Sequence, residues 1–158
     1  MTPHKLANGK VRAGRFLSVM SVIMIVVGTL FFIVDFQYFW MLDAMIANGH
    51  IQAVIDFSGL DYDTAVNCYY ATLVEGCIQS ALMITCGIFG LQVARGKGKI
   101  TVCQVLAILT LSLTILIFII VGFIFGFENM GPEAYILNIV IQTTFFVAVK
   151  REASSPYW

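Results

Sequence analysis

Four polar side chains occur as two pairs inside long apolar segments of this chain. Glu75 and Gln79 are four residues apart in one segment, and Asn138 and Gln142 have the same spacing in another. Residues at this spacing lie on one face of an α-helix. A carboxylate and three amides that meet across two helices could bind a cation, a proton or a polar head group. The same groups could instead form hydrogen bonds that only join the helices.

The composition shows what kind of elements must position these groups. Of 158 residues, 59% are hydrophobic and only 11% are charged, and the mean hydropathy is +0.90. A soluble globular domain carries about 25% charged residues. The sequence therefore predicts an integral membrane protein. The formal net charge is +0, so the chain lacks the basic field that nucleic-acid-binding proteins use, and we expect no nucleic-acid partner.

Four segments are long and apolar enough to cross a bilayer. A hydrocarbon core of about 30 Å needs about 20 helical residues, and each span must be a helix because lipid offers the backbone no hydrogen-bond partner. The links RGKGK and FENMGPE are short, so the last three spans should be antiparallel neighbours. The predicted fold is all-α, a single membrane domain over 1–158 that forms an up-down bundle of four transmembrane helices. We predict spans at residues 16–34, 71–94, 100–127 and 134–149.

Charged residues are distributed unevenly between the two sides of the predicted bundle. All nine Lys and Arg residues fall before the first span, in the RGKGK turn or after the last span. Cytoplasmic loops of membrane proteins carry the excess of Lys and Arg. We therefore expect a multi-pass protein of the plasma membrane, with the tails 1–15 and 150–158 both cytoplasmic. The end of the second span, GIFGLQVARGKGK, looks like many small prokaryotic four-helix membrane proteins, and this similarity implies a prokaryotic cytoplasmic membrane. All acidic residues except Glu75 and Glu152 fall at or beyond the opposite face.

Residues 35–64 form the sizeable segment expected outside the membrane. Its two halves, FQYFWMLDAMIA and HIQAVIDF, are mostly apolar and are separated by Asn48 and Gly49, which suit the end of a helix. The first half should extend the first helix or bend onto the head groups. The second half has the spacing of a short helix that lies on an apolar surface. Asp61 or Asp63 should cap the second spanning helix.

The predicted spans give a depth for each polar residue. Glu75 lies about 29 Å along its helix from Ala94, near the outer edge of the hydrocarbon core. Gln142 lies near the middle of the membrane. If the two polar faces meet, Glu75, Gln79, Asn138 and Gln142 line a strip from the outer mouth to the midplane. Two interpretations remain open: a vestibule for a ligand, or interhelical hydrogen bonds worth about 0.6 kcal/mol each.

Small residues predict where helices approach each other closely. Gly122 and Gly126 form a GxxxG motif in the third span, and this motif lets two helix backbones come together. In the second span, Gly76, Ser80 and Gly87 fall along one stripe. These residues could serve contacts within the bundle or contacts between subunits.

The sequence contains no pattern that predicts an enzyme. It has no Ser-His-Asp set, phosphate loop or haem motif, and its acidic residues lack the spacing of a calcium loop. Its four cysteines include no CxxC pair. We therefore expect no catalytic residue, no metal site and no cofactor.

Two functions remain for such a chain. The first is a non-enzymatic protein that acts through helix contacts, as a homo-oligomer or an accessory subunit, with the lipid bilayer and a second copy or another membrane protein as its partners. The second is a small transporter or channel-like protein with an outer acidic vestibule at Glu75. A water-accessible cavity around Glu75 would favour the second function. A Glu75 that faces head groups or bonds to a neighbour would favour the first.

Overall fold

Four long α-helices make up the part of the chain that the structure describes. The computed structural model describes residues 3–48, 52, 59–125 and 132–154, and these residues contain no strand. Each helix includes a stretch long and apolar enough to cross a membrane, which confirms the predicted all-α class with four helices of membrane-spanning length. The helices are α1 (Pro3–Ala47), α3 (Tyr62–Ala94), α4 (Ile100–Phe125) and α5 (Pro132–Ala153).

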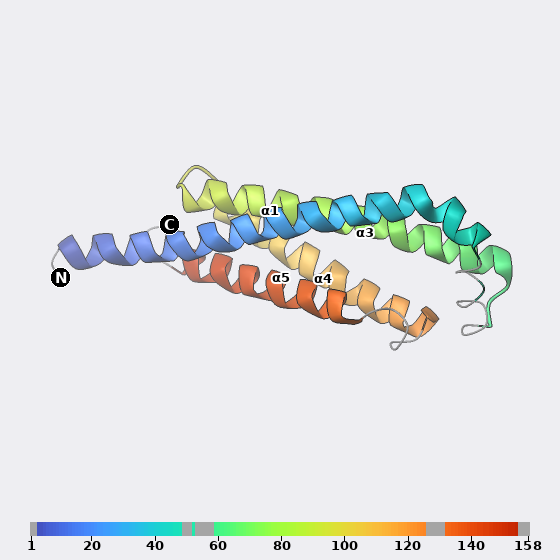
Figure 1. Cartoon of the computed structure of the whole chain (residues 1–158). Helices are drawn as coiled ribbons and strands as arrows, with labels where there is room; N and C mark the ends of the chain where they lie inside the picture. The colour runs from blue at the N-terminus through green and yellow to red at the C-terminus, as the bar shows by residue number, and fades with distance from the viewer. Residues whose placement is uncertain (1–2, 49–51, 53–58, 126–131, 155–158) are drawn as a thin grey trace.

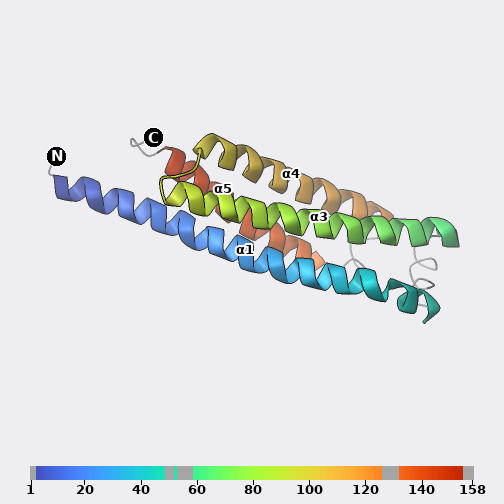
Figure 2. The same cartoon turned by 90° about the horizontal axis from the view of Figure 1, so that it is seen from above.

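The helices form a closed ring in which each packs against two others. α1 packs against α3, α3 against α4, α4 against α5, and α5 against α1. Successive helices run in opposite directions along the bundle (Figure 1; Figure 2). Both described ends of the chain and the turn 95–99 therefore lie in one half of the bundle, which we call the proximal half. The other half is the distal half.

The interior changes character along the bundle axis. In the proximal half the four helices contribute large apolar side chains to a continuous core, of which Leu17, Met24, Met83, Phe145 and Val149 are at most 1% exposed. In the distal half the polar side chains of Gln79, Ser80 and Thr114 are buried between the helices. The apolar core therefore holds the proximal half together, whereas the distal half must satisfy polar groups between its helices.

α1 and α3 extend past the spans that hydropathy predicted. α1 continues from the predicted end of the first span to Ala47, and α3 begins at Tyr62 rather than at residue 71. The two helices project together beyond α4 and α5 (Figure 1), and the rings of Phe39 and Tyr70 meet edge-on at 6.1 Å between centroids. Extension of the first helix is thus the option that the structure adopts. The predicted short helix at 51–58 lies outside the described residues, apart from Gln52.

The start of α3 is fixed by a side-chain cap. The backbone N–H of Thr64 donates a hydrogen bond to Oδ2 of Asp61 at 3.1 Å. Hydrogen bonding from the side chain of Thr64, together with this backbone bond, favours the charged carboxylate and lowers the pKa of Asp61. Of the two predicted caps, Asp61 is the N-cap, and Asp63 lies inside the first turn.

The end of α3 is fixed by a glycine turn. Gly96 has φ +71°, a conformation that suits glycine. Its N–H donates to the carbonyl of Val93 at 2.8 Å, and the N–H of Lys97 donates to the carbonyl of Gln92 at 2.9 Å. This is the hydrogen-bond pattern of a Schellman motif. It turns the chain from α3 into α4 within five residues, as the RGKGK sequence predicts.

Candidate functional site

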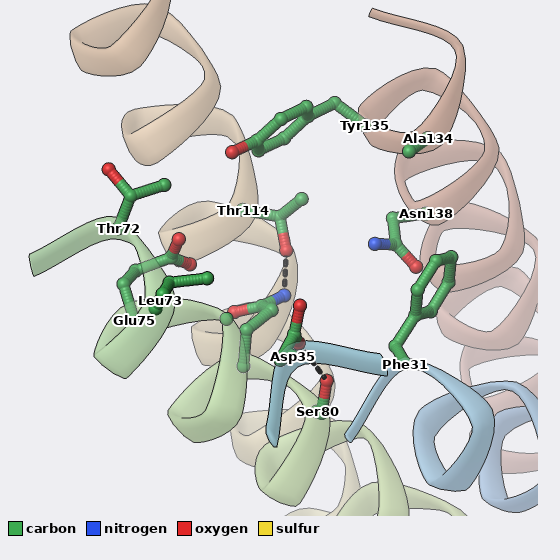
Figure 3. A pocket seen from close by; sticks show the side chains of 12 residues that line it. Phe31, Asp35, Thr72, Leu73, Glu75, Ser80, Thr114, Ala134, Tyr135 and Asn138 are labelled. Carbon is green, nitrogen blue, oxygen red and sulfur yellow. Dashed lines mark hydrogen bonds between the residues drawn. The ribbon is translucent and has the colours of Figure 1, made fainter. Parts of the chain in front are cut away.

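A cavity of about 150 Å³ lies between the four helices in the distal half of the bundle. All four helices contribute to its wall (Figure 3). Most of the side chains around it are polar, and two of them are carboxylic acids. The lining residues are Phe31, Asp35, Thr72, Leu73, Glu75, Gly76, Gln79, Ser80, Thr114, Ala134, Tyr135 and Asn138.

Asp35 reaches the cavity from α1 because α3 leaves room for it. The hydroxyl of Ser80 donates a hydrogen bond to Oδ2 of Asp35 at 3.2 Å. Gly76 lies directly against the same carboxyl group: a Cβ on this glycine would fall 2.9 Å from Oδ2 of Asp35. Any larger residue at position 76 would therefore displace the carboxylate. Gly76 and Ser80 on α3 together position the carboxyl group of Asp35.

Glu75 is the second carboxylate of the cavity and has more freedom than Asp35. Its side chain is partly exposed, and it has no hydrogen-bond or ion-pair partner among the residues that the structure describes. Figure 3 shows Asp35 and Glu75 directed from α1 and α3 toward the same space. None of the residues that line this cavity is Lys, Arg or His. Two carboxylates in such a site need a cation or a proton to balance them.

A hydrogen-bond network beside the cavity joins three helices. Nε2 of Gln79 on α3 donates to the hydroxyl of Thr114 on α4. The hydroxyl of Thr114 lies 2.8 Å from Oε1 of Gln142 on α5 and 3.0 Å from the carbonyl of Thr110. Because this hydroxyl has one proton, it donates to one of these acceptors at a time. Thr114 is thus the residue through which both glutamines are connected.

Three amide atoms around this network lack a partner among the described residues. They are Oε1 of Gln79, Oδ1 of Asn138 and Nε2 of Gln142. Gln79 is 6% exposed and Gln142 is 1% exposed. An unsatisfied buried polar group costs about 1–3 kcal/mol, so native proteins rarely leave one unpaired. Gln79 and Asn138 also line the cavity, but their unpartnered oxygens are buried away from its open space.

The structure brings the four predicted strip residues together. Glu75, Gln79 and Asn138 line one cavity, and Gln142 connects to it through Thr114. The prediction did not include Asp35 or Thr114. Asp35 falls just beyond the predicted first span, and α1 continues through it, so that its side chain lies beside α3 in the bundle. The sequence gives only a weak indication of Thr114, which is that Thr110 lies one turn earlier on the same helix face, so that two hydroxyl groups share that face.

The predicted small residues of α3 contact α1 of the same chain. Gly76 and Ser80 lie against Asp35, as described above. A Cβ on Gly87 would fall 2.6 Å from the carbonyl oxygen of Ser21 on α1. The stripe therefore serves packing within the bundle. In the GxxxG motif of α4, Gly122 is buried, whereas Gly126 lies outside the described residues.

The remaining candidate groups form no further site within the described residues. No group of three or more His, Cys, Asp or Glu residues there could hold a metal ion. The four cysteines are free thiols, and the buried thiol of Cys86 lies 3.1 Å from the hydroxyl of Thr110.

No protein-family model, curated protein or solved structure matches this chain. The features of this chain that indicate a function are therefore those of the cavity itself, which are its two carboxylates and the absence of a basic residue from its described wall.

Proposed function

We propose that this chain is a membrane transporter that binds a small cation in the distal cavity and carries it across the bilayer. One observation supports this above all: Asp35 and Glu75, from two different helices, line a cavity with no basic residue in its described wall. Both carboxylates are half-buried, and holding two partly desolvated negative charges in one cavity is unfavourable unless a positive charge or a proton compensates them. From the sequence, a cavity around Glu75 is also the feature expected of a transporter and not of a protein that acts only through helix contacts.

The arrangement of the helices supports insertion as a multi-pass bundle. Four apolar helices of sufficient length alternate in direction, so both termini would lie on one side of the membrane. The basic turn 95–99 and the basic last turn of α5 both belong to the proximal half. With the proximal half in the cytoplasm, the cavity occupies the outer part of the bundle in a cell membrane.

The apolar core supports a carrier rather than an open channel. Below the network of Gln79, Thr114 and Gln142, the interior is filled by Met24, Met83 and other buried side chains. No cation could pass these residues without a rearrangement. Transport would therefore require a second conformation in which the proximal half opens and the distal half closes.

A proteoliposome assay tests this function. The full chain is reconstituted with a pH-sensitive dye inside to report protons, uptake of labelled Na⁺ or a labelled organic cation is followed in parallel, and both fluxes are driven by a K⁺ diffusion potential. The parent chain should give proton or cation flux, and Glu75→Gln should reduce it at least tenfold because it removes one of the two charges. Glu133→Gln removes an exposed carboxylate at the start of α5 and should leave flux unchanged. Equal flux in the parent and in Glu75→Gln would exclude Glu75 from any transport mechanism.

Action through helix contacts, as a homo-oligomer or an accessory subunit, stays a prediction. The small residues that suggested it on α3 contact α1 of the same chain. An assembly would therefore use other surfaces, such as the outer face of α4. Mass measurement in mild detergent distinguishes a defined oligomer from a monomer.

A further inference from the structure

We propose that the ligand of the distal cavity is a small organic cation with a flat apolar body, such as an aryl-substituted ammonium or guanidinium ion, rather than a metal ion. This inference rests on the proposed function and names the class of its substrate. Three properties of the cavity carry it: the volume, the apolar part of the wall and the sign of its polar groups.

The volume is suited to a molecule larger than a metal ion. At about 150 Å³, the cavity equals the size of engineered apolar cavities that bind benzene. Ca²⁺ and Mg²⁺ require about six oxygen ligands at about 2.0–2.6 Å, which in proteins usually include clustered carboxylates. The described residues contain no cluster of three acidic, His or Cys residues. A metal ion would therefore leave most of this space unfilled.

The wall combines aromatic and apolar groups with the two acids. Phe31 and Tyr135 line the cavity together with Leu73. Figure 3 shows Phe31 across the cavity from Glu75, and the ring of Tyr135 above Thr114. A cation near the face of an aromatic ring is attracted by the negative face of the ring, and the attraction is stronger when the cation is desolvated. A hydrated metal ion would gain little from such a wall, whereas an organic cation has a body that can contact it.

The two charged groups of the cavity are carboxylates, which can only accept hydrogen bonds when they are ionised. Asp35 and Glu75 contribute carboxylate oxygens. Gln79, only 6% exposed, uses its amide nitrogen on Thr114 and leaves Oε1 without a partner among the described residues, and Oδ1 of Asn138 is likewise unpartnered. An ammonium or guanidinium group carries several N–H donors and a positive charge. It would donate hydrogen bonds to the two carboxylates and compensate their charge at once.

Binding of benzylammonium to the full chain in detergent tests this inference. Titration calorimetry should detect binding of benzylammonium, with at least tenfold weaker binding of benzyl alcohol, which has the same shape and no charge. Glu75→Gln and Asp35→Asn should each reduce the affinity for benzylammonium at least tenfold. Phe31→Leu should reduce it several-fold because it removes a ring and keeps an apolar wall. Glu133→Gln is the matched control and should not change it.

The outcomes separate this inference from the proposed function. Binding of Na⁺ without benzylammonium would overturn the organic-cation ligand and leave cation transport standing. Proton flux without binding of either ion would do the same and identify the proton as the substrate. Absence of both binding and flux would overturn the inference and the proposed function together. Circular dichroism and elution as a single species show whether each variant folds, and Phe31→Leu keeps the test available if Asp35→Asn does not.

Discussion

Thr114 places a hydroxyl group of the apolar helix α4 between the helices, where it forms hydrogen bonds with polar side chains of α3 and α5. In such helices a threonine hydroxyl commonly donates to the carbonyl one turn earlier, and Thr114 makes this contact with Thr110. Its oxygen still accepts from Gln79, and its proton can turn to Gln142 instead. The hydroxyl therefore adapts to either glutamine without disturbing α4.

Replacing Thr114 by valine should destabilise the bundle by about 1–3 kcal/mol, because Nε2 of Gln79 and Oε1 of Gln142 would both lose their partner. Valine keeps the shape of threonine and removes only the hydroxyl. The free energy of unfolding is measured by titration with a denaturing detergent in mixed micelles.

The control for this variant is Thr114→Ser, which keeps the hydroxyl and loses a methyl group. It should cost less than Thr114→Val. If the valine variant were as stable as the parent chain, the network would contribute nothing to stability, and its groups would be maintained for the ligand alone.

At the scale of single residues, the sequence predicts the polar strip, but it does not predict which residues of other helices face the strip. Spacing alone showed that Glu75 and Gln79 share a helix face, and likewise Asn138 and Gln142. Spacing within one helix says nothing about which other helix faces it. Asp35 and Thr114 belong to α1 and α4, and only the packing of the four helices brings them to the same cavity.

At the scale of elements, the close contact between α1 and α3 positions Asp35. Glycines on both helices permit it: a Cβ on Gly28 of α1 would fall 3.1 Å from the carbonyl oxygen of Ser80, and Gly76 and Gly87 of α3 are equally constrained by α1. Small residues let helix backbones approach in this way. The two carboxylates share a cavity because these helices lie so close together.

Gly87→Ala should therefore destabilise the protein by up to about 2 kcal/mol. Its Cβ would fall 2.6 Å from the backbone carbonyl oxygen of Ser21, and a backbone atom cannot rotate away. Overpacking usually costs about 1–3 kcal/mol, and the gain of about 1 kcal/mol that alanine brings to a helix offsets part of it. Thermal unfolding in a fixed detergent measures the difference.

Gly14→Ala makes the same substitution where the nearest atom, the carbonyl oxygen of Ala94, is 3.3 Å away. It should change stability much less than Gly87→Ala. Equal shifts in the two variants would show that close packing at Gly87 does not hold α1 against α3.

The existence of the helices was easier to predict than their ends. Hydropathy identifies a stretch of membrane length, and all four such stretches lie within observed helices. Helix ends depend on caps and on residues that interrupt the helix. No Gly or Pro occurs between Gly28 and Ala47, so α1 continues past its apolar stretch, and α3 begins at the Asp61 cap rather than where hydropathy rises.

At the scale of the whole molecule, the sign of the charge and the polarity of the interior both change along the bundle axis. The proximal half carries the described basic turn 95–99, the basic end of α5 and the apolar core. The distal half carries the cavity with its two carboxylates. A bundle with this polarity should insert in one orientation, and the cavity would then face a single side of the membrane.

Cysteine labelling in intact cells tests that orientation. The four native cysteines are first replaced by alanine, and Asn67→Cys or Lys97→Cys is added at positions that are both exposed. A membrane-impermeant maleimide should label Asn67→Cys in intact cells and Lys97→Cys only after permeabilisation, because basic loops are retained in the cytoplasm. The reverse pattern would place the cavity on the cytoplasmic side, so that the ligand enters from the cell interior. Labelling of both positions from outside would show two orientations in one membrane, and the charge asymmetry would then not direct insertion.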